Sequence, residues 1–563
     1  MNIIKWTLIN VCSIVMVACN FTEDQDISDV NHIILVGQSL GAAEHSLPIV
    51  TDSPTGYGNL RFKIGTHTWK RGYLENQPER RDSTLFAFVP LTAVERGHEG
   101  ETIGNGLCDH LKSSTSGFTK KDFRFLFSFT GEGSRLIREL DKVHDDAKDP
   151  RAADRQNKGG YYATILDDVK RAKLICDTSH KTYSVMAITW MQGESNRFGH
   201  ITRWDKPLEN KKDFMELYIK DLIQLKNDLQ KDIRALTLQK KSIPFFTYQT
   251  AGANIGTAQL MACDREKDMY MVGTTYMMPS ARNSRVWGTQ EHGEPIHLSA
   301  DGERWLGEMF AKVLRKVIFE KKEWTPLRPL NATLKDPQHI IVKFNVPEPP
   351  LTLDTLFLPK QGSGCGFSVY SKTKALNVVK ASVIGQDAVE LVLGEALEDA
   401  DSYFVSYGLD TYSRDLSGKI IAVGAKDSVI NGVPYISVEF AGDITGEFKI
   451  ISAEGSFMLV NKNIEYSDLT TAIIRKVFLN KNGNTVVIGE RKELRNNRPF
   501  KVGQNCYVQR EYGYGNLRDN DPEKSIFTFA DKQYGNRQGQ HYPLYNWCIV
   551  FDDLIITKKG VKQ

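Results

Sequence analysis

HIILVGQSLG, the stretch from His32 to Gly41, decides how the first half of this chain folds. It joins a short aliphatic run to a glycine-flanked serine, Ser39, and the small residues Ala42 and Ala43 follow. The pattern predicts a buried parallel strand whose carboxyl end delivers Ser39 to the start of a helix. Ligands of open α/β sheets bind at the carboxyl ends of strands, and backbone N–H groups at a helix start can hold an oxyanion. Ser39 is therefore a candidate nucleophile.

Strand-like and helix-like segments alternate from His32 to about Lys322. Strands are predicted at 33–36, 123–129, 183–190, 243–248 and 270–275, and helices at 102–111, 161–176, 212–233 and 300–319. This alternation predicts an α/β domain with a parallel sheet covered by helices on both faces. Two sizeable loops are expected near the strand ends, at 56–79 and 145–160.

The texture changes past Lys322, where prolines and turn residues separate short strand-like runs. Strands are predicted at 339–344, 388–393, 403–407, 435–440, 448–451 and 485–488. Short strands at this spacing are typical of β-sandwich modules. We expect a fibronectin type III-like sandwich at 326–415 and a second β-rich module at 416–563.

The composition is that of an ordinary globular protein. The chain has 563 residues, of which 41% are hydrophobic and 25% charged, and its formal net charge is +3. The length predicts two to four domains. So small a net charge for this length gives no reason to expect nucleic acid or an anionic membrane surface as a partner.

The N-terminus has the pattern of an export signal. One lysine, Lys5, precedes an apolar run that ends in Met16-Val17-Ala18 and is too short to span a bilayer. Cys19 follows, as in a bacterial lipobox, so residues 1–19 are predicted to be a lipoprotein signal peptide with Cys19 lipidated. Plain secretion with cleavage nearby is the alternative. Either way the mature protein is expected outside the cytoplasm, in the periplasm or at the outer membrane or cell surface. The cysteines after Cys19 are scattered, without a C-x-x-C pair, and predict no zinc site.

A carboxylate and a histidine lie close together near the end of the α/β region, in Glu294-Pro295-Ile296-His297. Because the carboxylate precedes the histidine by three residues, one tight turn can present both side chains. The acid can then accept a hydrogen bond from Nδ1–H, which leaves Nε2 of His297 to take a proton from a serine hydroxyl. His292 lies in the same loop and is the competing histidine. Asp301 is interpreted as a first-turn acid of the next helix.

Polar residues also follow the predicted strand at 183–190, in WMQGESN from Trp190 to Asn196. Polar side chains beside a glycine at a strand end are what an oxyanion hole needs. The Gln192 amide can donate to a developing negative charge, or it can simply tie two loops together. Glu194 is interpreted as an anchor behind the site and not as a proton donor.

These three blocks together resemble the SGNH/GDSL hydrolase superfamily, in particular its branch of sialic-acid-type carbohydrate O-acetylesterases. The resemblance covers about 31–322 and implies a flavodoxin-like α/β/α domain at 20–325. In this chain Leu40 replaces the asparagine that usually follows the serine, and Glu294 stands where aspartate is commoner. The resemblance implies no cofactor and no metal.

The resemblance also implies a set of site residues. The triad would be Ser39, His297 and Glu294. The oxyanion hole would use Ser39, Gln192 and a glycine of a block at 97–104, where we choose Gly104 over Gly100. Supporting residues would be Gln38, Gly193, Glu194 and Gln259.

The implied function is an exported serine esterase that removes O-acetyl groups from a carbohydrate, either a sialic acid or a polysaccharide. Its partner would be the acetylated sugar, and it would meet a membrane only through a lipid at Cys19. One alternative is an inactive glycan-binding lipoprotein in which Leu40 is the lesion. Another is a lipid or thioester hydrolase, which needs a long apolar groove that the polar loops do not suggest.

Overall fold

The computed structural model describes residues 27–68, 78–142, 160–196, 211–250, 253–279, 281, 297–358, 360–371, 375–397, 403–409, 417–424, 428–430, 433–442, 457–461, 471–491, 500–503, 505–510, 514–530 and 537–558. The predicted signal peptide with Cys19, the carboxylate of Glu294, and His292 lie outside these residues. Much of the two predicted loops also lies outside them. The strand expected at 448–451 falls outside them as well.

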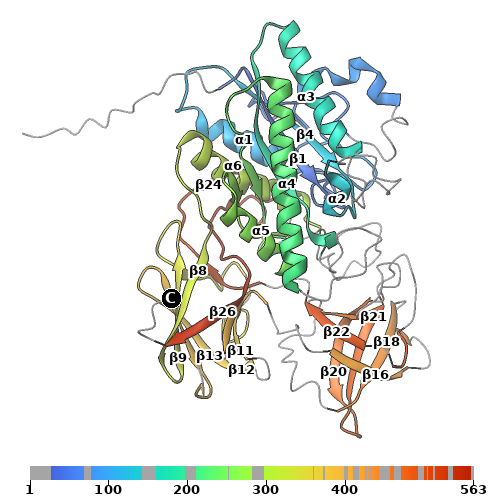
Figure 1. The fold of residues 1–563 in the computed structure, drawn as a ribbon, viewed down its shortest axis with the longest axis vertical. Coiled ribbons are helices and arrows are strands. Elements are labelled where there is room, and N and C mark those ends of the chain that lie inside the picture. Colours follow the sequence, from blue (N-terminus) through green and yellow to red (C-terminus); the bar gives the residue numbers. More distant parts are fainter. Residues whose placement is uncertain are drawn as a thin grey trace, which may run out of the picture.

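The α/β region is built on one seven-stranded sheet of order β3-β2-β4-β1-β5-β6-β7 (Figure 1). Its strands are β1 Val30–Gly37, β2 Leu60–Phe62, β3 Phe88–Pro90, β4 Arg124–Gly131, β5 Tyr183–Met191, β6 Phe245–Thr247 and β7 Met269–Met271. Only β3 runs antiparallel to its neighbour. Strand β1, formed by the aliphatic run, is buried along its whole length at the centre of the sheet.

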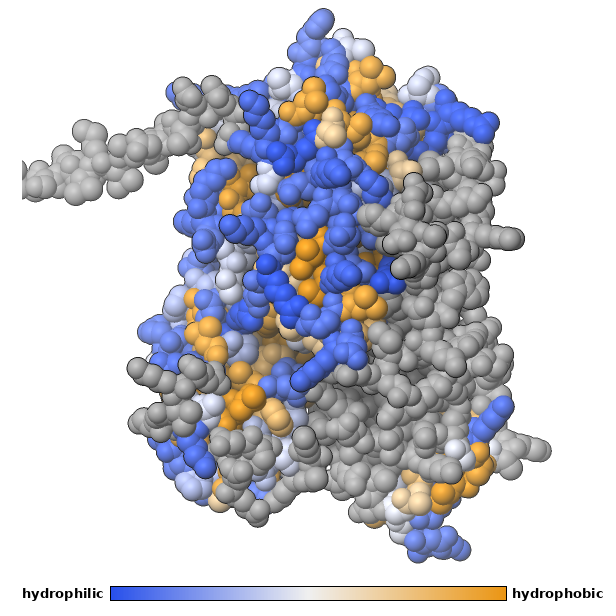
Figure 2. Space-filling model, in the orientation of Figure 1, coloured by the Kyte–Doolittle hydropathy of each residue, from blue (hydrophilic) through white to orange (hydrophobic). Residues whose placement is uncertain are grey.

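Helices cover both faces of this sheet. They are α1 Ile103–Thr115, α2 Ile137–Leu140, α3 Gly160–Thr178, α4 Lys211–Thr237, α5 Ala253–Arg265 and α6 Ala300–Leu314, the last continued by a π-helical turn at Arg315–Phe319. Short 3-10 turns lie at Pro78–Arg81, Ser83–Phe86 and Glu194–Asn196. Ile33 and Leu35 of β1 pack toward α1 and α6, whereas Ile34 and Val36 pack toward α3, α4 and α5. The predicted parallel sheet with two covered faces is therefore present. The coloured surface in Figure 2, which belongs to the described residues, is mostly hydrophilic.

The helix expected directly after Ser39 is absent from the described residues. Residues 39–43 instead form turns, in which Ala42 N–H donates to Gln38 O and Glu44 N–H donates to Ser39 O, both over 2.9 Å. Ala43 and His45 have φ angles of 57° and 69°. Because left-handed residues interrupt the helical ladder, this segment closes into turns and cannot continue as a helix.

Two further large sheets, of eight and seven strands, follow the α/β region. The first is eight-stranded, with order β12-β11-β15-β26-β8-β9-β14-β13. It comprises β8 Arg328–Asp336, β9 His339–Asn345, β11 Phe367–Tyr370, β12 Ala375–Leu376, β13 Val378–Ile384, β14 Ala388–Leu393, β15 Phe404–Tyr407 and β26 Phe551–Lys558. Short pairs are formed by β10 Thr352–Leu353 with β23 Leu517–Arg518, and by β24 Lys524–Thr528 with β25 His541–Pro543.

The second large sheet has the order β16-β22-β19-β20-β21-β18-β17, and β16 also pairs with β18, which closes the row into a ring. Its strands are β16 Ser417–Val423, β17 Ser428–Ile430, β18 Val433–Phe440, β19 Phe457–Asn461, β20 Thr471–Leu479, β21 Thr485–Arg491 and β22 Asn505–Arg510. The sandwich character expected for the C-terminal half, and the flavodoxin-like detail of the first domain, stay predictions.

The sheet pattern differs from the expected single unit at 416–563. Residues 417–510 form the ring, but β26 pairs with both β8 and β15 in the middle of the eight-stranded sheet. The ring is thus an insertion between β15 and the final strands. The insertion begins with β16, close to the module boundary expected at residue 415, and only the strand pairing reveals that the chain comes back.

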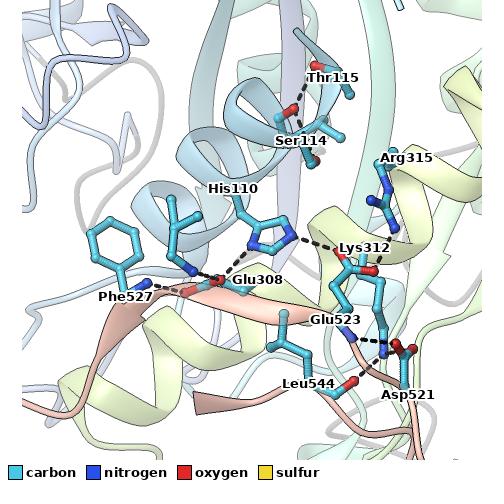
Figure 3. A network of polar contacts seen from close by, with 12 residues as sticks. His110, Ser114, Thr115, Glu308, Lys312, Arg315, Asp521, Glu523, Phe527 and Leu544 are labelled. Carbon is cyan, nitrogen blue, oxygen red and sulfur yellow. Dashed lines mark hydrogen bonds and ion pairs between the residues drawn. The ribbon is translucent and has the colours of Figure 1, made fainter. Parts of the chain in front are cut away.

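The chain that comes back, residues 514–550, is here named the return segment, and it docks on α1 and α6 through buried charges (Figure 3). His110 of α1 hydrogen-bonds Glu308 through Nδ1 (2.6 Å) and Glu523 through Nε2 (2.9 Å). The Lys312 ammonium donates to Asp521 (3.0 Å) and to the Leu544 carbonyl. Because a buried charge without its partner is strongly destabilising, this network holds the return segment against the helices.

Helices α1 and α6 approach more closely than ordinary side chains permit. A Cβ added to Gly106 would lie 2.0 Å from the Arg304 carbonyl oxygen, and one added to Gly307 would lie 2.3 Å from the Ile103 carbonyl oxygen. Only glycine fits these two positions.

Among the described residues, no helix has the length and apolarity to span a membrane.

Replacing Gly106 by alanine should destabilise the protein by about 1–3 kcal/mol, because the new methyl overpacks against backbone that cannot rotate away. This loss outweighs the roughly 1 kcal/mol that alanine gains over glycine in a helix. Thermal unfolding of Gly106→Ala checks this result. Gly117→Ala is the matched control, since a Cβ there meets nothing within 4 Å. Equal melting temperatures for the two variants would contradict the close approach.

The His110 network should also make stability depend on pH. Burial alone would lower the pKa of His110, but the hydrogen bonds and charges of Glu308 and Glu523 raise it from 6.5 to about 8. A raised folded-state pKa stabilises the fold fully below the unfolded value and loses that contribution as pH rises through the folded value. The stability advantage of the wild type over His110→Gln should therefore shrink by about 2 kcal/mol between pH 6 and 9. Thermal unfolding across this range measures it, and His541→Gln, an exposed histidine, should show no such trend.

Candidate active site

Ser39 lies two residues past Gly37, the last residue of β1, and begins the turns that follow the strand. It is only 5% exposed. Strand β1 lies between β4 and β5, and the strands added after it in sequence go first to the β4 side and then to the β5 side. Such a reversal of strand order opens a crevice at the carboxyl ends, where α/β proteins bind their ligands. The serine therefore lies at the edge of the sheet where a site is expected.

The loop after Ser39 packs against the segment that carries His297. Ser46 Oγ donates to the Leu298 carbonyl over 2.8 Å. The His45 ring packs edge-on against the His297 ring, with 4.8 Å between centroids. Glu44, whose N–H donates to Ser39 O, places a carboxylate oxygen 4.0 Å from His297 Nε2. The loop that follows Ser39 therefore contacts His297 and Leu298, which lie about 250 positions later in the chain.

Gln38 links the serine to the loop after β5. Its amide Nε2 lies 3.5 Å from Ser39 Oγ, and its Oε1 accepts from the N–H groups of Gly193 (3.3 Å) and Ser195 (3.2 Å). A Cβ at Gly193 would lie 2.7 Å from the Thr250 methyl carbon, so only glycine allows this approach. Both residues were expected to support the site, and they lie together beneath the serine.

The Gln192 side chain is fully buried and its amide is committed to neighbouring loops. Nε2 donates to the Arg135 carbonyl (3.0 Å) and to Asn196 Oδ1 (2.6 Å), and Oε1 accepts from the Tyr218 hydroxyl (3.0 Å). Both amide hydrogens are used in this way. Of the two roles that the sequence allows, the geometry favours tying loops together over donating to an oxyanion.

Glu194 and Gln259 complete a buried frame behind this loop. Glu194 Oε1 accepts from the Thr250 hydroxyl (2.6 Å) and from the Tyr248 hydroxyl. Gln259 donates to the Gln192 carbonyl (2.7 Å) and accepts from Thr250 N–H (2.9 Å). These contacts make both residues anchors of the loop after β5.

Gly104 lies in the helix cap and not in a strand-end loop. Its N–H donates to the Thr102 hydroxyl (3.2 Å), and a Cβ there would lie 2.6 Å from the Phe127 ring. The Gly100 N–H is likewise used, by the Ala43 carbonyl (3.0 Å). Gly104 and Gly100 therefore serve capping and packing, and the oxyanion assignment of Gly104 does not fit the structure.

Gly133 is the glycine that faces the nucleophile loop. It follows β4 in Gly131-Glu132-Gly133, and a Cβ added to it would lie 2.0 Å from Glu44 Oε1. Among the described residues, its N–H donates to no other group, and the same holds for Ser39 N–H. Sequence reasoning missed this residue. The signal was available, because a glycine pair directly follows the strand predicted at 123–129.

The carboxyls of Glu101, Glu194 and Glu303 are buried near this edge of the sheet. Burial, then the charges of Glu101 and Glu194, raise the pKa of Glu303 well above its usual value. Burial also raises the pKa of Glu101, although its carboxylate accepts from the N–H groups of Val50 and Thr51, each at 3.0 Å. Within the described ranges, no three His, Cys, Asp or Glu side chains are arranged to hold a metal ion.

Comparisons with known proteins place this chain in no family. No protein-family model and no curated protein matches it. Among solved structures, a carbohydrate acetylesterase from Xanthomonas citri is 13% identical with a TM-score of 0.42, over 67% of this chain and 75% of that one. NanS is 13% identical with a TM-score of 0.34, over 52% of this chain and 99% of that one.

A third similar structure is Est24, a carbohydrate acetylesterase from Sinorhizobium meliloti, at 11% identity and a TM-score of 0.24, over 51% of this chain and 99% of that one. Identities and TM-scores this low assign no function to the chain.

Gln192→Ala should lower the melting temperature, because Asn196, Tyr218 and the Arg135 carbonyl would lose buried partners at about 1–3 kcal/mol for an unsatisfied group. Gln386→Ala, at an exposed position, is the matched control and should melt like the wild type. Thermal unfolding and turnover are measured together. An unchanged melting temperature with turnover reduced about 10²–10³-fold would instead make Gln192 an oxyanion donor.

Proposed function

We propose that this chain is a serine esterase that removes O-acetyl groups from carbohydrates. The observation that carries the proposal is the packing of the loop after Ser39 against His297 and Leu298, at the carboxyl end of the central strand. A hydroxyl and an imidazole at one sheet edge, beside backbone N–H groups, are the parts that acyl transfer requires. The expectation of export and of lipidation at Cys19 stays a prediction.

In the proposed mechanism, His297 Nε2 takes the proton of Ser39 Oγ as that oxygen attacks the acetyl carbonyl. The tetrahedral intermediate collapses when His297 gives this proton to the sugar oxygen, which leaves as the free hydroxyl and leaves an acetyl group on Ser39. Water then attacks the acetyl-serine as the same imidazole takes its proton. The imidazolium returns this proton to Ser39 Oγ when the bond between the acetyl carbon and Oγ breaks, which restores the serine hydroxyl and releases acetic acid, present as acetate after it ionises. Glu294 would hold the ring by accepting from Nδ1–H and would stabilise the imidazolium that forms.

The oxyanion would be held by two backbone donors, the N–H groups of Ser39 and Gly133. Neither donates to another described residue, and both belong to loops at the ends of adjacent strands. Gly133 replaces Gly104 in this role, because the Gly104 N–H is used by its helix cap. Donors of this kind typically contribute about 10²–10³ in turnover.

The substitution at Leu40 does not favour an inactive protein. The Leu40 side chain is 2% exposed and belongs to the apolar cluster between the sheet and helices α1 and α6. It is a core residue and not part of the polar rim. Among the described residues, the rim beside the serine includes Glu44, His45 and His98. Such polar side chains suit a hydroxyl-rich alcohol better than the long apolar chain of a lipid or thioester substrate.

Ser39→Ala should reduce acetate release from an O-acetylated sugar at least about 10³-fold, because in the proposed mechanism the acyl-enzyme forms on the Ser39 hydroxyl. His297→Ala should have a similar effect and Glu294→Gln a smaller one. Ser116→Ala, at an exposed position after α1, is the control. Acetate is measured on acetylated xylan, acetylated monosaccharides and acetylated sialic acid. Equal release by the wild type and Ser39→Ala would contradict the proposal.

A further inference from the structure

The Glu44 carboxylate lies between two histidines at the nucleophile. Oε1 is 3.8 Å from His98 Nε2, and Oε2 is 4.0 Å from His297 Nε2. The Glu44 side chain is 14% exposed. It is therefore largely enclosed by its neighbours but still partly exposed to solvent.

The backbone on both sides of Glu44 holds this carboxylate in place. Ala43 and His45 both have left-handed φ angles, a conformation that persists only where surrounding contacts impose it. His45 N–H donates to the His98 carbonyl over 2.6 Å. At Gly133 any Cβ would collide with Glu44 Oε1, so glycine there leaves room for the carboxylate.

The guanidinium on the loop after β4 does not pair with Glu44. Arg135 lies two residues past Gly133, but its Nη atoms are engaged by Glu132 (3.0 Å) and Glu139 (3.2 Å). The neighbouring carboxylate of Glu99 is already held by His67 Nδ1 over 2.9 Å. Among the described acids on the loops beside the nucleophile, Glu44 is the one with a carboxylate oxygen 4.0 Å from His297 Nε2.

We propose that Glu44 is a specificity-determining residue that makes the esterase select neutral O-acetylated sugars over acidic ones. The inference rests on the proposed function, because the sugar oxygen that His297 protonates must lie at Nε2, within a few ångströms of Glu44. A carboxylate on the sugar near the ester then meets a like charge in a partly buried place, where water screens it poorly. The Glu44 carboxylate attracts the imidazolium that forms on His297 during the reaction, so it does not slow the reaction of neutral substrates.

The test uses two substrates that differ in one group. An O-acetylated methyl glucoside and the O-acetylated methyl glucuronide share the ester and the ring, and only the second carries a carboxylate at C6. Rates of acetate release are measured at pH 8 and low salt as kcat/KM for each. We expect the wild type to prefer the neutral sugar by about tenfold or more, and Glu44→Gln to reduce this preference to near unity.

Glu99→Gln is the matched control, since it removes one negative charge from the same region but not from beside Nε2. It should keep the wild-type preference. The wild type alone provides a second readout, because its preference should fall as salt rises from about 0.05 to 0.5 M. This measurement does not depend on whether the Glu44 variant folds.

The outcomes separate the two proposals. An active wild type whose preference is the same in Glu44→Gln, or is absent, or is unaffected by salt, overturns the role of Glu44 and leaves the esterase intact. A Glu44→Gln variant that loses activity equally on both sugars also overturns it, because Glu44 would then act only on His297. Failure of the wild type to exceed Ser39→Ala on either sugar overturns the proposed function itself.

Discussion

The pairing of β1 with both β4 and β5 is the constraint on which the rest of the site depends. Gly37 at the end of β1 is opposite Gly131 on one side and Met191 on the other. A Cβ on Gly37 would lie 2.2 Å from the Met191 carbonyl oxygen, and one on Gly131 would lie 1.9 Å from the Gly37 carbonyl oxygen. Three strands therefore end at one level, closer together than side chains would permit. The loops that follow these three strands therefore begin next to one another.

The histidine reaches this point by a different route. His297 precedes α6, and α6 packs against α1 and against the return segment. Asp301 in its first turn accepts from the Tyr542 hydroxyl (2.6 Å) and from Ala530 N–H (2.9 Å). Because these partners come from the far end of the chain, the last residues of the sequence help to position the helix next to the candidate base. The ring of β-strands inserted before them does not interrupt that function.

Charge gives the site its character. The acids behind it, Glu101 and Glu303, are buried so deeply that their pKa values rise, which favours their neutral forms. Glu44, in contrast, lies at the partly open rim between two imidazoles. Burial and exposure thus divide acids that the sequence cannot tell apart. The one at the rim is the one that a substrate would meet.

Local patterns by themselves determined much of this protein. The aliphatic run at 33–36 predicts β1, and the periodicity at 300–319 predicts α6. Ser39 is a candidate because it follows the first block, and His297 is a candidate because it precedes the second and lies three residues after Glu294. Such features depend on neighbours within a few residues, which the sequence shows directly. Only the tertiary structure decided that turns and not a helix follow Ser39, and that Gln192 ties loops together. It also decided that Gly133 and not Gly104 faces the nucleophile, and that residues after 513 return to α1 and α6. Each of these depends on which strands are neighbours and on partners tens to hundreds of residues away, and no local pattern records that.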